Sequence, residues 1–88
     1  MTESAKTQKE AQKKAAIEAA EREAEIDSIF CAVFKGASGE KALNYLKNMT
    51  LNRVLPASAT DSELRQREGQ REIVAHIIRR VENGRNRQ

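Results

Sequence analysis

The sequence has very few of the residues that catalysis and metal binding most often use. Its 88 residues include one histidine, His76, and one cysteine, Cys31. Metal sites in proteins commonly need three or four ligands with histidine or cysteine among them, and this count falls short. Nucleophilic catalysis needs a nucleophile, a base and an orienting group, and His76 could assist Cys31 only through an accident of the fold. We therefore predict that the chain is not an enzyme and uses no metal and no cofactor.

Large apolar side chains are also scarce. There is no tryptophan, the aromatic residues are two phenylalanines and one tyrosine, and many of the apolar residues are alanines. A chain this short buries a smaller fraction of its surface than a larger domain does. Between Met1 and Ile26 the only large apolar side chain is Ile17, so the core must come from residues 26–81. We expect stability to depend on a partner or on self-association.

Glycine and proline are absent before Gly36, which predicts one long helix over residues 3–35. Up to Glu25 its apolar stripe is thin and consists of Ala16, Ala20 and Ala24 with Ile17. From there the stripe becomes a full apolar face with helical spacing, made of Ile26, Ile29, Phe30, Val33 and Phe34. The second half of the helix is expected to pack within the chain. The first half is expected to be a solvated arm or a helix that packs against a neighbouring helix.

Two further helices follow. Gly36 can end the first helix and Ser38 can cap a second one over residues 39–51. Pro56 marks a connection over residues 52–59, and Thr60 with Glu63 has the pattern of a capping box. A third helix is predicted to reach about Glu82 and to end at Asn83 and Gly84. Gly69 inside it predicts either a close crossing by another helix or a helix start near Gln70.

The predicted fold is therefore all-α, a small three-helix domain with a long protruding N-terminal helical arm. Its parts are the arm at residues 1–25, the domain at 26–82 and a basic tail at 83–88. No apolar run approaches the ~20 residues needed to span a bilayer, and the N-terminus lacks the apolar centre of a signal peptide. We expect no membrane contact.

Positive charge gathers toward the C-terminus. The net charge is +3, with residues 1–25 contributing −1 and residues 26–88 contributing +4. Four arginines near the C-terminus are the best candidates for contact with nucleic acid, because arginine binds phosphate through two hydrogen bonds: Arg79, Arg80, Arg85 and Arg87. The same residues also suit the negative end of a helix dipole, and the aromatic side chains that would stack on single strands are missing near them.

The face formed by Ile26, Ile29, Phe30, Val33 and Phe34 is the candidate surface for a protein partner. Most of it is expected to pack inside the chain itself. The arm beyond it has nothing in its own chain to pack against, and a helix-in-groove or bundle contact with another subunit would supply that neighbour.

Two segments carry a resemblance to a known family. One runs from Phe34 through Gly36 to Leu46, a helix end followed by a small-residue turn and a second helix. The other is the signature Glu68, Gly69, Gln70 and Arg71, followed by an apolar helix to Ile78. Together they resemble a family of small proteins of short-tailed bacteriophages that are encoded near the head and packaging genes. The resemblance covers about residues 29–80 and leaves the arm outside.

The resemblance implies a phage structural or morphogenesis role, in the virion and, during assembly, in the host cytoplasm. The leading hypothesis is a virion component that binds a head (capsid), portal or tail-machine protein in several copies. One alternative is a DNA-binding packaging factor of the small-terminase type, which would use the four C-terminal arginines. Another is a transient scaffold or adaptor that is absent from finished particles. In all three, Gly36 and the Glu68–Arg71 signature are expected mainly to fix the fold.

Overall fold

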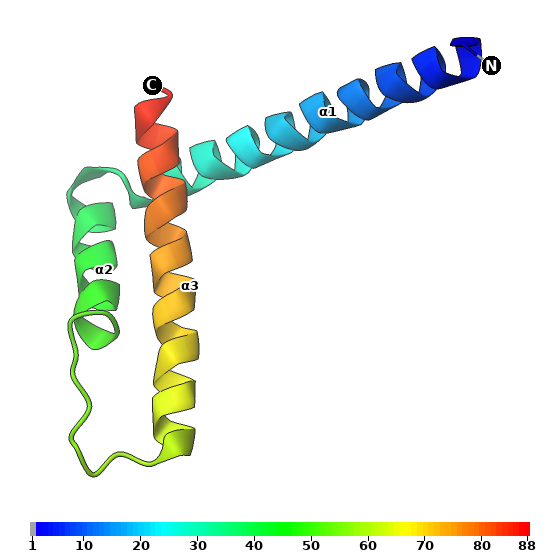
Figure 1. Ribbon diagram of the computed structural model, residues 1–88. Helices are drawn as coiled ribbons and strands as arrows, with labels where there is room; N and C mark the ends of the chain where they lie inside the picture. Colours follow the sequence, from blue (N-terminus) through cyan, green and yellow to red (C-terminus); the bar gives the residue numbers. More distant parts are fainter. Residues whose placement is uncertain (1) are drawn as a thin grey trace.

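The structure is a computed structural model that describes residues 2–88. It consists of three helices, α1 (Thr2–Phe34), α2 (Gly36–Met49) and α3 (Asp61–Asn86) (Figure 1). The prediction of an all-α fold with a long N-terminal helix is confirmed. Met1, the first residue of the predicted arm, lies outside the described residues.

The turn between α1 and α2 depends on two glycines. Gly36 has a φ of 80°, a left-handed conformation that favours glycine, and it ends α1 as expected. Gly39 is buried, and a Cβ there would collide with the backbone carbonyl group of Phe34. The prediction that Ser38 caps α2 is wrong, because Lys35 holds the N-cap position without a side-chain cap. The left-handed turn at Gly36 lets the chain re-enter a helix at once.

Hydrogen bonds from side chains hold the connection between α2 and α3. The Thr50 hydroxyl donates to the carbonyl of Leu46 at 2.6 Å, and the Arg67 guanidinium reaches back to the carbonyl of Met49 at 2.8 Å. At the start of α3, the backbone N–H of Glu63 donates to the Thr60 hydroxyl at 3.2 Å. The predicted cap at Thr60 is thus confirmed.

Helix α3 differs from its prediction at two glycines. It continues to Asn86, so Asn83 and Gly84 do not end it, and most of the predicted basic tail is helical. Gly84 is instead a buried helical residue at the point where α1 crosses. Both alternatives predicted for Gly69 are wrong: a Cβ there would meet no atom within 4 Å, so no helix crosses closely, and α3 already begins at Asp61 rather than near Gln70.

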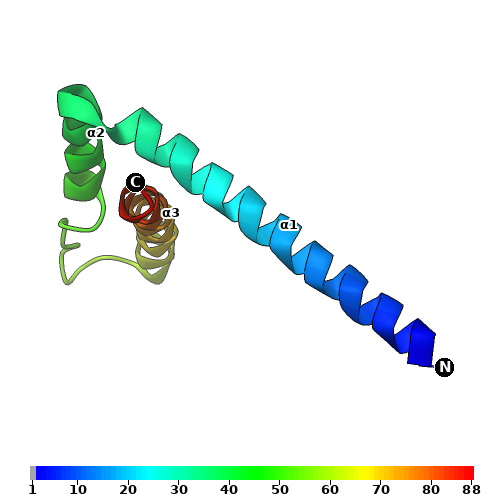
Figure 2. The ribbon, with the colours of Figure 1, turned by 90° about the horizontal axis from the view of Figure 1, so that it is seen from above.

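The three helices form a thin and elongated molecule. Helix α2 runs beside α3, while α1 crosses the C-terminal end of α3 and then extends away from it (Figures 1 and 2). The extents are 64 × 36 × 14 Å, and the radius of gyration is 19.5 Å. A compact domain of this length has a radius of gyration of about 12 Å. Side chains from Ala5 to Glu23 are all exposed, which confirms the protruding arm.

The fold buries little apolar surface. Its buried apolar side chains among the described residues are Cys31, Leu43, Val74 and Val81. The accessible surface is 7146 Å², whereas a compact monomer of this mass exposes about 5,200 Å². The excess of about 1,900 Å² exceeds the ~800 Å² that each partner buries in a standard protein interface.

Within residues 2–88, no helix is long and apolar enough to cross a membrane.

Candidate functional site

The helices α1 and α3 cross in close contact at Gly84. A Cβ added at Gly84 would lie 2.5 Å from the Cβ of Cys31 and 2.6 Å from the carbonyl oxygen of Asp27. Only a residue without a side chain lets the two backbones approach this closely. Cys31 is 2% exposed, and its side chain is packed at this contact as a small apolar group.

A buried ionic cluster lies beside that crossing. Asp27 is 1% exposed, and it accepts a hydrogen bond from Arg80 at 3.0 Å and a second one from Arg87. Arg80 also forms an ion pair with Glu23. Burial raises the pKa of Asp27, but the hydrogen bonds and charges of the two arginines outweigh burial, so this pKa lies below its ordinary value. The hydrogen bond with Glu23, followed by that with Asp27, raises the pKa of Arg80.

The sequence analysis missed the role of Asp27. A signal for it was present, because Asp27 is the one acidic residue between Ile26 and Phe34, inside the apolar half of α1. The complementary signal lies on α3, where Arg80, Gly84 and Arg87 are spaced four and three residues apart and so share one face. On that face, the glycine allows close contact with α1, and the arginine on each side of it supplies a positive charge.

The four C-terminal arginines have different surroundings. Arg80 and Arg87 are paired with Asp27, which compensates part of their charge. Arg85 lies 4.0 Å from Glu40, and both side chains are largely exposed. Arg79 lies 3.1 Å from Nδ1 of His76. The positive charges of Arg79 and Arg85 are the least compensated of the four. The binding of nucleic acid by these residues stays a prediction.

Cys31 and His76 lie in different surroundings. Cys31 lies at the crossing of α1 and α3. The half-buried His76 lies on α3, within hydrogen-bond distance of Arg79 and Arg80. The absence of enzymatic activity stays a prediction.

The apolar face predicted on α1 is divided between two environments. Ile26, Phe30 and Phe34 are half-buried. Ile29 and Val33 are 54% and 64% exposed, and they lie on the side of α1 away from the buried residues Asp27 and Cys31. The structure therefore brings the five predicted residues onto one helix but leaves two of them as open apolar surface.

A second open apolar surface is a shallow groove of about 440 Å³ between α2 and α3. Its exposed walls include Met49 at 42% and Ile73 at 63% exposure. Gly69, where no helix crosses, is one of the residues that line this groove. The full lining is Leu46, Met49, Thr50, Gly69, Gln70, Ile73 and Val74.

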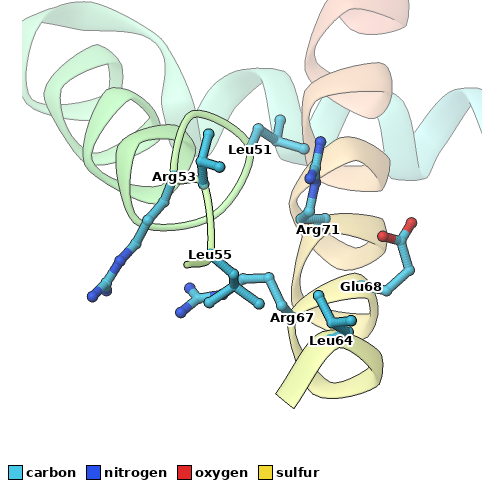
Figure 3. A pocket seen from close by; sticks show the side chains of 8 residues that line it. Leu51, Arg53, Leu55, Leu64, Arg67, Glu68 and Arg71 are labelled. Atoms are coloured by element: carbon cyan, nitrogen blue, oxygen red, sulfur yellow. The ribbon is translucent and has the colours of Figure 1, made fainter. Parts of the chain in front are cut away.

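Next to this groove lies a mixed apolar and basic pocket of about 300 Å³ (Figure 3). Glu68 and Arg71 of the predicted signature line it together with Arg67 and Leu64 from the same helix. The loop after α2 supplies the opposite wall with Leu51, Arg53, Val54 and Leu55. Gly69 and Gln70 contribute to the apolar groove instead, so the signature spans the boundary between the two depressions.

These features define a class of protein: a small all-α chain with a slender core, a protruding helical arm and open apolar surfaces. Residues 30–87 match the family described as Bbp19-like phage protein. Because the match covers more than half of the 88 residues, the chain belongs to this phage protein family. The phage resemblance is confirmed at that level, and the arm lies outside the match. No match to a curated protein or to a solved structure was found.

Proposed function

We propose that this chain is a structural or assembly protein of the phage particle that binds another virion protein, from the head, portal or tail machine, in several copies. The observation that carries the proposal is the imbalance between buried and exposed apolar surface in a phage protein. Among the residues that the structure describes, four apolar side chains are buried, while Ile29, Val33, Met49 and Ile73 are each more than 40% exposed. Burial of such surface against a partner is the main favourable contribution to protein association.

The groove between α2 and α3 is the part of this surface best suited to the other virion protein. It lies entirely within residues 30–87, the segment shared with the phage family. Its lining is almost wholly apolar, and a helix or extended segment with an apolar side chain could fill it. Thr50 in its wall is buried and already bonded within the chain, so filling the groove leaves its hydroxyl paired.

The test is incorporation into particles during infection with variant phage. Ile73→Asp places a charge in the groove at an exposed position, so we expect it to fold normally and to be lost from purified virions. Val54→Asp is the matched control, since Val54 is 91% exposed and lies outside the groove, and we expect normal incorporation. Normal incorporation of the Ile73 variant would overturn the proposed use of the groove.

Purified wild-type particles decide between this proposal and the alternatives. A chain present in every particle supports a structural role. A chain that is needed for particle formation but missing from particles would support the transient scaffold or the packaging factor. The packaging factor further requires DNA binding that weakens steeply with salt and is lost when Arg79 and Arg85 become glutamine.

A further inference from the structure

The outer side of α1 carries a regular stripe along almost its whole length. Its residues are alternately four and three positions apart, which is the spacing of a coiled-coil seam. The C-terminal part of the stripe consists of Ala15, Ala19, Arg22, Ile26, Ile29 and Val33. The same spacing continues toward the N-terminus at Gln12, Gln8 and Ala5. A third of all residues in the chain are charged, yet this stripe contains a single charge, that of Arg22.

The structure leaves the stripe uncovered. Among the described residues, α2 and α3 lie on one side of α1 and no element lies on the opposite side (Figure 2). Every stripe residue is exposed except Ile26, which is half-buried. The contacts with α3 are made from the opposite face of α1, through Asp27 and Cys31. A neighbouring helix could therefore lie along the stripe without displacing α3.

The charges of α1 identify the neighbour. Residues 3–14 hold four lysines and two glutamates, whereas residues 18–27 hold five acidic residues and one arginine. A second α1 in antiparallel orientation brings the basic half of each helix against the acidic half of the other. Parallel pairing would instead place like charges together and set Arg22 beside Arg22. The stripe carries only the charge of Arg22, and the two halves of α1 have net charges of opposite sign, so the helix is complementary to an antiparallel copy of itself.

We infer that two copies of this chain pair through antiparallel α1 helices, in a two-fold dimer with a folded domain at each end. The longest overlap of the stripe places Ala15 opposite Ala19 and Ile29 opposite Ala5 of the second copy. Small residues at the centre let the helices approach closely, and the apolar residues Ile26 and Ile29 gain cover at both ends. This deepens the multi-copy part of the proposed function and leaves the groove between α2 and α3 free for the other virion protein.

The first experiment measures the mass of the purified full chain by light scattering over a range of concentrations. We expect a mass approaching twice the 9.9 kDa of one chain at high concentration. Ala19→Glu charges the centre of the stripe and should reduce the mass to that of one chain. Ala20→Glu is the matched control, because it makes the same change at an exposed position on the other side of α1, and it should pair as the wild type does.

The second experiment determines orientation by disulfide trapping, with the native thiol removed by Cys31→Ala. We expect a mixture of the Ala15→Cys and Ala19→Cys chains to form the mixed disulfide well ahead of either chain with itself. Self-linking of each variant alone would show parallel helices and overturn the inference. So would a single-chain mass at every concentration, or a dimer that survives Ala19→Glu.

The outcome is separable from that of the proposed function. Pairing is measured on the purified chain, and Ile73→Asp should leave it intact while it blocks incorporation into particles. Failure of pairing with normal incorporation would reject the arm dimer alone. Intact pairing with no chain in purified particles would reject the structural role alone.

Discussion

The two halves of α1 show how the same helix can be held in place in different ways. From Asp27 onward, α1 is fixed by a glycine contact and an ionic cluster with α3. From Ala5 to Arg22, every side chain is exposed, and the helix depends on the strong helix propensity of alanine, glutamate, lysine and glutamine. Substitutions in the packed half should therefore alter the stability of the whole domain, whereas substitutions in the arm should act locally or on association.

The largest effect is expected for Asp27→Ala. Removal of this carboxylate leaves Arg87 without its partner and removes one of the two carboxylates that hold Arg80. We expect loss of the cooperative thermal transition, measured by circular dichroism. Glu25→Ala is the control, since Glu25 is an exposed acidic residue on the same helix. Equal melting of the two variants would show that the cluster does not hold the crossing.

The next largest effect on stability is expected from substitutions of two glycines of α3, which should have opposite signs. Gly84→Ala forces a Cβ against Cys31 and the backbone of Asp27, and we expect destabilisation by about 1–3 kcal/mol. Gly69→Ala meets open space inside a helix and should stabilise by about 1 kcal/mol. Urea unfolding of both variants measures the two signs. A stabilising alanine at position 84 would mean that the helices do not approach closely there.

Acid should weaken the packed half. The pKa of Asp27 is lower in the folded chain than its unfolded value of about 3.9. Its contribution to stability is therefore complete above that value and is lost as the pH falls through the lower folded-state pKa. We expect the urea midpoint to fall below about pH 4 in the wild type. In Asp27→Asn the midpoint should be lower at neutral pH, and its fall in acid should be shallower. An equally steep fall in the variant would assign the acid sensitivity to other carboxylates.

The smallest effect is expected in the arm. Ala16→Gly weakens the local helix by about 1 kcal/mol, but Ala16 is exposed and lies outside the packed half. Hydrogen exchange should become faster around residue 16, while the exchange of Val74 and Val81 on α3 stays unchanged at a concentration where the chain is a single copy. Faster exchange at Val81 would show that the arm and the domain unfold together.

The sequence predicted the helices well because their signals are local. The long run without glycine or proline predicted α1, and Thr60 with Glu63 predicted the start of α3. The error at Gly84 arose where distant segments meet. Gly84 looks like a helix end when α3 is considered alone, and only the crossing with α1 explains why a glycine lies inside the helix.

The site was predicted only in part for the same reason. Helical spacing identified the apolar face from Ile26 to Phe34, but it could not show that Ile29 and Val33 stay exposed while Asp27 is buried. The C-terminal arginines looked like free positive charge, and the pairing of Arg80 and Arg87 with Asp27 joins residues more than fifty positions apart. The groove between α2 and α3 also depends on how two helices lie side by side.

The most direct test of the central claim is the copy number of this chain in purified phage particles, measured by quantitative mass spectrometry together with particle reconstruction. The proposal predicts a fixed, symmetric copy number, with the groove between α2 and α3 filled by a head, portal or tail-machine protein. Complete absence of the chain from infectious particles would contradict a structural role in the virion.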